Sequence, residues 1–190
     1  MQTQLAGIAQ SLESAQSRLR RLTDQLPESD WNRKPAANRW SAAECVEHLN
    51  LTSRAYIPLL RDAIARAGEV RRSPTKHYRH EALGWFLSMM FGPLRHLGRF
   101  KLVRVKTTPA FVPKPGRSRT EILSDFVRHQ GELISLVRSA DGLPIDQVKI
   151  ISPFGGRMRY SAYSALVIVS RHEHRHLEQA EDAARHRVTA

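Results

Sequence analysis

Apolar residues recur at steps of three and four along the first part of the chain. In residues 2–26 they share one helical face: Leu5, Ile8, Leu12, Ala15, Leu19, Leu22 and Leu26. This spacing predicts an amphipathic helix with one buried side, and Pro27 ends it. Residues 27–40 contain two prolines and two asparagines, so they are predicted to form a connecting loop.

A capping box opens the second helical stretch. Ser41 is the predicted N-cap, and Glu44 follows three residues later. The helix is expected to run to about Ala67, to close at Gly68 and to bend at Pro58. Its inward face carries Cys45, His48, Leu49, Thr52, Tyr56 and Leu59 or Leu60. An imidazole therefore lies within a core-facing stripe.

Residues 69–116 lack a sustained period. A shorter helix is expected within Glu81 to Arg99, interrupted at Gly92-Pro93, followed by an extended proline-rich stretch. Helical periodicity returns in residues 118–139, with Ser118 or Thr120 as cap, on Ile122, Phe126, His129 or Gln130, Leu133, Leu136 and Val137. A link through residues 145–160 leads to a last helix that starts at Ser161.

Four amphipathic helices, two of them separated by a long crossover, predict an all-α four-helix bundle. We expect a single domain over residues 1–190, with residues 69–116 as an elaborated crossover loop that holds a short helix.

The last helix carries His172 and His176, four residues apart on one face, and His174 points elsewhere. The apolar residues before this pair, among them Ile168 and Val169, continue the same stripe toward the core. In a bundle, His48 can face the pair. Three imidazoles without a protein carboxylate leave positions open, which is typical of a catalytic rather than a structural metal site. Since nine histidines produce such spacings by chance, a solvated polar helix end is the alternative.

The net charge of +12 is concentrated in residues 66–119, which hold 13 Lys and Arg against two acids. Such a segment can attract nucleic acid, an acidic membrane or an anionic small molecule. No nucleic-acid motif accompanies it, so nucleic acid is not the expected partner. The longest uncharged stretch has 13 residues, too short to span a bilayer. A single cysteine, Cys45, excludes an internal disulfide and fits a cytoplasmic location.

Three blocks of the sequence resemble the DinB-like (DinB/YfiT-type) superfamily of metalloenzymes. They are residues 40–49 (Trp-Ser-Ala-Ala-Glu-Cys-Val-Glu-His-Leu), the Ser152-Pro153-Phe154-Gly155 turn, and His172, His176 and Gln179 on the last helix. The resemblance implies an up-down-down-up bundle that is usually a homodimer. It also implies a divalent ion held by His48, His172 and His176. Some relatives are metal-dependent transferases or isomerases that use bacillithiol, mycothiol or glutathione.

An open three-histidine ion lowers the pKa of a bound thiol or of a bound water. The leading hypothesis is therefore a transferase that uses a low-molecular-weight thiol on a small, anionic substrate. Hydrolysis is the alternative, and a basic binding module or a dimeric scaffold without chemistry are the others. Zinc is expected first and nickel second.

Other polar residues are assigned lesser roles. Gln179, one turn beyond His176, is a second-shell or substrate-orienting group. Glu44 is explained by capping, Glu47 is expected on the solvated side, and Cys45 is expected to be a small core residue. The remaining histidines are expected at the surface or in loops: His77, His80, His96, His129, His174 and His186.

Overall fold

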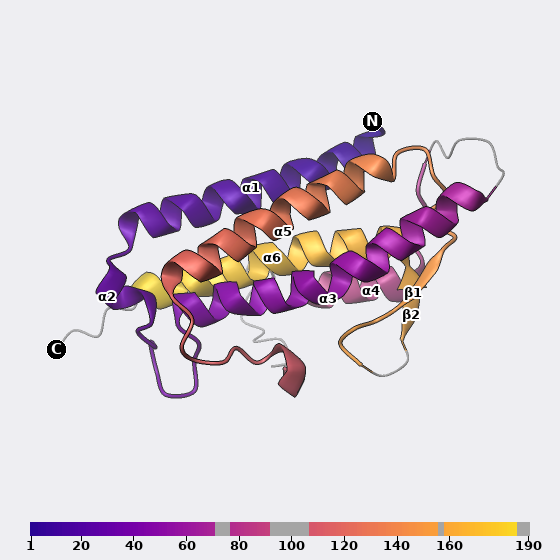
Figure 1. Cartoon of the computed structure of the whole chain (residues 1–190). Helices are drawn as coiled ribbons and strands as arrows, with labels where there is room; N and C mark the ends of the chain where they lie inside the picture. Colours follow the sequence, from indigo (N-terminus) through magenta and orange to yellow (C-terminus); the bar gives the residue numbers. More distant parts are fainter. Residues whose placement is uncertain (71–76, 92–106, 156–157, 186–190) are drawn as a thin grey trace.

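The computed structural model describes residues 1–70, 77–91, 107–155 and 158–185. Four long helices lie side by side in this part of the chain: α1 (Thr3–Gln25), α3 (Ala42–Glu69), α5 (Arg119–Ser139) and α6 (Ala162–Arg185). In Figure 1, α1 and α6 run in one direction and α3 and α5 in the other, so the connection between α3 and α5 must return along the bundle. The predicted all-α architecture is confirmed.

The central helix of the bundle is α3, because it packs against both α5 and α6, as α1 does on the opposite side. Leucines from all four long helices fill the interior and are at most 1% exposed: Leu5, Leu12, Leu49, Leu60, Leu133 and Leu166. Burying one such side chain contributes about 1.5–3 kcal/mol relative to leaving it exposed. A helix with two packed neighbours has two buried faces, and both faces of α3 carry polar groups.

Capping boxes begin two of the four helices. The Ser41 hydroxyl accepts from the Glu44 amide, and the Glu44 carboxylate accepts from the Ser41 amide. Ser118 and Glu121 make the same reciprocal pair at the start of α5. The predicted C-terminus of α3 at Gly68 is two residues early, since the helix continues to Glu69. Pro58 lies inside α3, which changes direction along its length in Figure 1.

Short elements fill the segments that were predicted as loops. A one-turn helix, α2 (Glu28–Trp31), buries Trp31 completely, and the Arg119 guanidinium lies 5.2 Å from the centre of its ring. The link before α6 contains an antiparallel hairpin, β1 (Lys149–Ile151) and β2 (Arg159–Ser161), in which Ile150 pairs with Tyr160. Strands of three residues carry too little alternation to be seen in a sequence.

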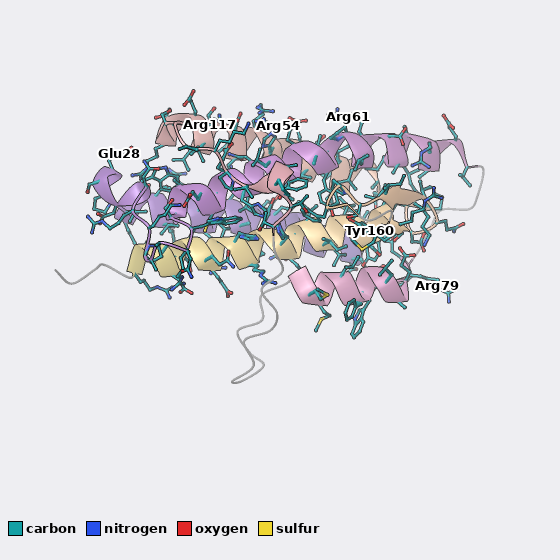
Figure 2. The ribbon with its side chains drawn as sticks, turned by 90° about the horizontal axis from the view of Figure 1, so that it is seen from below. Glu28, Arg54, Arg61, Arg79, Arg117 and Tyr160 are labelled. Carbon is teal, nitrogen blue, oxygen red and sulfur yellow. The ribbon has the colours of Figure 1, made fainter. Side chains whose placement is uncertain are left out.

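The crossover is partly described. Helix α4 (Ala82–Phe91) packs against α6 on the side away from Arg54, Arg61 and Arg117 (Figure 2). A 3-10 turn, η1 (Pro109–Phe111), touches α3. The predicted helix break at Gly92-Pro93 lies outside the described residues. No helix among the described residues is long and apolar enough to span a membrane.

Candidate metal centre

Three buried imidazoles meet between α3 and α6. His48 comes from the second turn of α3, while His172 and His176 lie one turn apart on α6. Their side chains are at most 8% exposed. Each ring offers one nitrogen, and these three nitrogens lie within 4.8 Å of one another. The structure thus brings together all three histidines singled out in the sequence.

The imidazole separation suits a metal ion. Nε2 of His48 lies 3.4 Å from Nε2 of His172. Two ligands about 2.0–2.1 Å from a tetrahedral zinc ion are themselves roughly 3.3 Å apart. A nitrogen-only donor set of this kind suits zinc, nickel or copper better than calcium or magnesium, which prefer oxygen.

A backbone carbonyl fixes the tautomer of His48. Nδ1 of His48 lies 2.8 Å from the carbonyl oxygen of Phe111 in η1. A carbonyl only accepts, so Nδ1 must carry the proton. Nε2 of the neutral ring then presents a lone pair to the other two histidines. This is the arrangement in which the second nitrogen of a metal-binding histidine is oriented by a hydrogen bond.

Electrostatics keep the cluster neutral. Burial lowers the pKa of His48 and lowers the pKa of His172 and His176 well below the usual value. The rings depress one another's pKa, and the Arg175 guanidinium lowers the pKa of His172 and His176 further. Neutral imidazole is the form that binds metals, so the cluster is in its ligating state at neutral pH.

The cluster forms part of the wall of a pocket of about 700 Å³. Aromatic rings flank the histidines: Trp40 lies 4.9 Å from His48, and Phe154 lies 5.6 Å from His172, between ring centres. Two guanidinium-bearing residues, Arg39 and Arg175, also line the pocket, while no Asp or Glu is among its described lining residues. The pocket therefore favours an anionic ligand.

Gln179 and Cys45 line the same pocket. The Gln179 side chain interacts with His176 and opposes part of the fall in its pKa. Cys45 is 1% exposed, in agreement with its predicted place in the core. Burial raises the pKa of its thiol to about 12, Glu44 adds to the rise and Arg39 opposes it. Glu44 caps α3, as predicted.

Two predicted surface residues are buried. Glu47 is 6% exposed and His129 is 2% exposed, so both expectations were wrong. Glu47 faces α5, where Arg117 donates to its carboxylate at 2.9 Å. Assigning one inward stripe to α3 leaves its second buried face unnoticed, and the partner Arg117 is 70 residues away in sequence.

The other histidines take no part in the cluster. His174 is half-buried on another face of α6, and its Nε2 lies 3.1 Å from the Ser11 hydroxyl. His77 and His80 are exposed, as predicted. His96 and His186 lie outside the described residues. Phe111, Arg39 and Arg175 contribute to the site but were not selected from the sequence, because loop residues and charged helix residues carry no periodic signal.

Comparison with known families decides the classification. The sequence signature of the DinB superfamily matches residues 11–180. This chain belongs to the DinB superfamily. No curated protein and no solved structure matches the chain. The DinB signature extends from α1 to α6, and all three histidines of the cluster lie within the matched residues.

Proposed function

We propose that this DinB-superfamily chain binds one divalent metal ion through His48, His172 and His176 and catalyses a transfer reaction of a low-molecular-weight thiol. One observation carries the proposal: three neutral imidazoles converge on one point in the wall of a pocket that no described carboxylate lines. Three protein ligands leave room for an exogenous ligand, as in catalytic sites. Zinc is the first candidate because of its availability, and nickel is the second.

A divalent ion in such a site lowers the pKa of a thiol that binds to it, which produces a thiolate nucleophile at neutral pH. The chain's own residues prepare the site for that chemistry. The histidines need not lose protons before binding the ion. Trp40 and Phe154 replace water beside the rings with apolar surface, and a drier surrounding strengthens the electrostatic interactions within the site.

Arg39 and Arg175 suit an anionic thiol or acceptor. They lie on the same pocket wall as the histidines, and the positive charge of Arg175 reaches two of the three rings. Together with a divalent ion, the two guanidinium groups leave the pocket strongly positive. Thiols such as glutathione carry carboxylates, which arginine binds through paired hydrogen bonds. Gln179, next to His176, is placed to orient such a ligand.

Metal analysis tests the proposal. The wild-type protein, His48→Ala and His172→Ala are purified in parallel, stripped, reloaded with zinc or nickel and assayed for bound metal. We expect about one ion per chain in the wild type and a loss in both variants. Equal metal content in all three proteins would reject the metal centre.

Thiol binding to the metal-loaded protein then tests the reaction class. Trp40 lies beside the rings, so its fluorescence reports ligands that enter the pocket. Saturable quenching by glutathione, mycothiol or bacillithiol supports the transferase. A metal-loaded protein that binds none of these thiols but hydrolyses a model ester would favour the hydrolase.

A further inference from the structure

We propose that Arg117 is a positioning residue for the metal centre. By joining Glu47 on α3 to Asp125 on α5, Arg117 fixes the segment whose Phe111 carbonyl orients His48. The inference rests on the proposed metal-binding function, and it assigns a role to an ion-pair network that lies outside the pocket.

The first end of this device is the Phe111 carbonyl. It lies 2.8 Å from Nδ1 of His48. The Phe111 side chain is 5% exposed, and its ring packs edge-on against Phe154 with 5.0 Å between ring centres. The hydroxyl of Thr108 donates to the carbonyl of Phe154 at 3.2 Å. The 3-10 turn is thus seated on the wall of the pocket.

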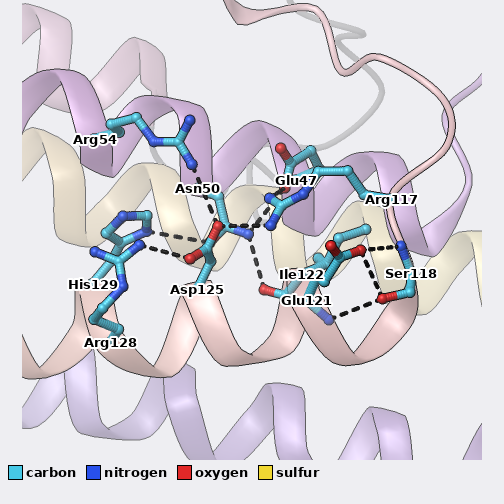
Figure 3. A network of polar contacts seen from close by, with 10 residues as sticks. All are labelled: Glu47, Asn50, Arg54, Arg117, Ser118, Glu121, Ile122, Asp125, Arg128 and His129. Atoms are coloured by element: carbon cyan, nitrogen blue, oxygen red, sulfur yellow. Dashed lines mark hydrogen bonds and ion pairs between the residues drawn. The ribbon is translucent and has the colours of Figure 1, made fainter.

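The second end is Arg117, just before the N-cap of α5. Its guanidinium donates to Glu47 at 2.9 Å and to Asp125 at 2.8 Å (Figure 3). Asn50 donates a further hydrogen bond to the same Glu47 oxygen at 3.1 Å. A planar guanidinium can bridge two carboxylates in a defined orientation, which an ammonium group cannot reproduce. The segment is therefore bound to both helices at this point.

A stiff connection joins the two ends. Residues 112–116 read Val-Pro-Lys-Pro-Gly, and the two proline rings restrict φ. Pro113 is buried, and Gly116 has a φ of 103°, a conformation that favours glycine. A displacement at Arg117 is therefore transmitted toward Phe111. Because Glu47 and His48 are consecutive in α3, the ligand and its orienting carbonyl are held to the same helical turn.

The decisive experiment compares Arg117→Ala with Arg54→Ala and Arg128→Ala. All three arginines contact Asp125, but among them only Arg117 belongs to the Phe111 segment. In the metal-free protein, imidazole 15N spectra report which nitrogen of His48 is protonated. We expect a fixed Nδ1–H tautomer in the wild type and both controls, and a mixture of tautomers in Arg117→Ala.

Metal affinity is the second measurement, made by competition with a chelator. Loss of an outer-shell partner typically weakens binding about 10–100-fold, and we expect that range for Arg117→Ala and no change for the controls. Arg117→Ala with the wild-type tautomer and wild-type affinity would overturn the proposal. A wild type that binds no metal would reject the proposed function, while the 15N spectra would still decide the role of Arg117.

Gly116→Val provides an independent perturbation if Arg117→Ala does not fold. It keeps every charge, and a Cβ at position 116 meets no atom within 4 Å, so the change acts through the backbone alone. A β-branched residue strongly disfavours positive φ. We expect the same mixture of His48 tautomers, and an unchanged Nδ1–H signal would contradict the proposal. Arg117→Lys should recover only part of the wild-type metal affinity.

Discussion

Two consecutive residues of α3 enter two different buried polar clusters. Glu47 faces α5 and joins a network of ion pairs, whereas His48 faces α6 and joins the other two histidines of the cluster. Both side chains are less than 10% exposed. Only the way in which their polar atoms are satisfied separates the two clusters.

In the Glu47 cluster the protein supplies the partners. Glu47 accepts from Arg117 and Asn50, and Asp125 accepts from Arg117 and Arg128. In the histidine cluster, three like groups face one another without a described acid among them, and the lone pair of His48 is directed at another imidazole. A charge network completed from within holds helices together, while a set of facing donor nitrogens is suited to a ligand from outside.

The largest expected contrast is between His48→Ala and Glu47→Ala. His48→Ala should weaken metal binding by more than about 100-fold, since loss of a ligand exceeds the loss of an outer-shell partner. Glu47→Ala leaves Arg117 and Asn50 short of an acceptor, so it should lower the free energy of unfolding by about 2 kcal/mol. Its metal affinity should stay within about tenfold of the wild type, because Arg117 keeps Asp125.

Chelator competition and urea unfolding of the metal-free proteins measure the two quantities. The contrast would disappear if His48→Ala lowered the free energy of unfolding as much as Glu47→Ala and left the metal affinity unchanged. The histidines would then be an ordinary part of the core.

Acid should destabilise the metal-free protein through the histidine cluster. Burial lowers the folded-state pKa of His48, His172 and His176 below the unfolded value near 6.5. The unfolded chain therefore takes up protons first as the pH falls. Stability that is complete above about pH 6.5 is lost below it, by up to about 1.4 kcal/mol per pH unit for each imidazole.

Urea unfolding of wild type and His172→Ala at pH 7.5, 6.5 and 5.5 measures this dependence. We expect a shallower loss in the variant, which has one buried imidazole fewer. Burial also lowers the pKa of His129 and His80, but these residues contribute equally to both proteins. Parallel pH profiles would show that His172 titrates normally in the folded chain.

The same comparison explains what the sequence could predict. The first helix was expected over residues 2–26 and spans Thr3–Gln25, because its apolar stripe is continuous. Residues 118–139 likewise correspond to Arg119–Ser139, where a capping box marks the start. His48, His172 and His176 were found because each interrupts an apolar stripe with a ring that needs a partner.

The Glu47 cluster could not be predicted in this way. A periodicity analysis assigns one buried face to each helix, whereas α3 lies between α5 and α6 and has two. Glu47 and His129 were consequently expected in solvent. Their partners, Arg117 and Asn50, follow no period, so only the packing of the helices shows that the charges are matched. The hairpin and the Phe111 carbonyl are equally invisible, because backbone contacts leave no residue-type signature.

A smaller effect is expected from the cationic wall of the pocket. Arg175→Gln should weaken the binding of an anionic thiol such as glutathione about tenfold, since hydrogen bonds to charged groups contribute about 1.5–3 kcal/mol. Metal affinity should change little, because Arg175 is not among the converging groups. Titration of metal-loaded protein with glutathione tests this, and Arg171→Gln is the matched control on the same helix. Equal glutathione affinity in all three proteins would contradict the anionic-ligand assignment.

The smallest effect on metal binding is expected from Cys45, the one residue between the two clusters that has metal-binding chemistry of its own. Its pKa near 12 keeps the thiol protonated at neutral pH, and thiolate is the form that binds metals. Its sulfur is also not among the atoms that converge with the three histidines. Cys45→Ser should therefore change the metal dissociation constant by less than about threefold. Iodoacetamide should label the unfolded chain far faster than the folded protein at pH 8. A Cys45→Ser protein that loses its metal as His48→Ala does would instead make the centre a four-ligand site, and four protein ligands leave no position for a thiol.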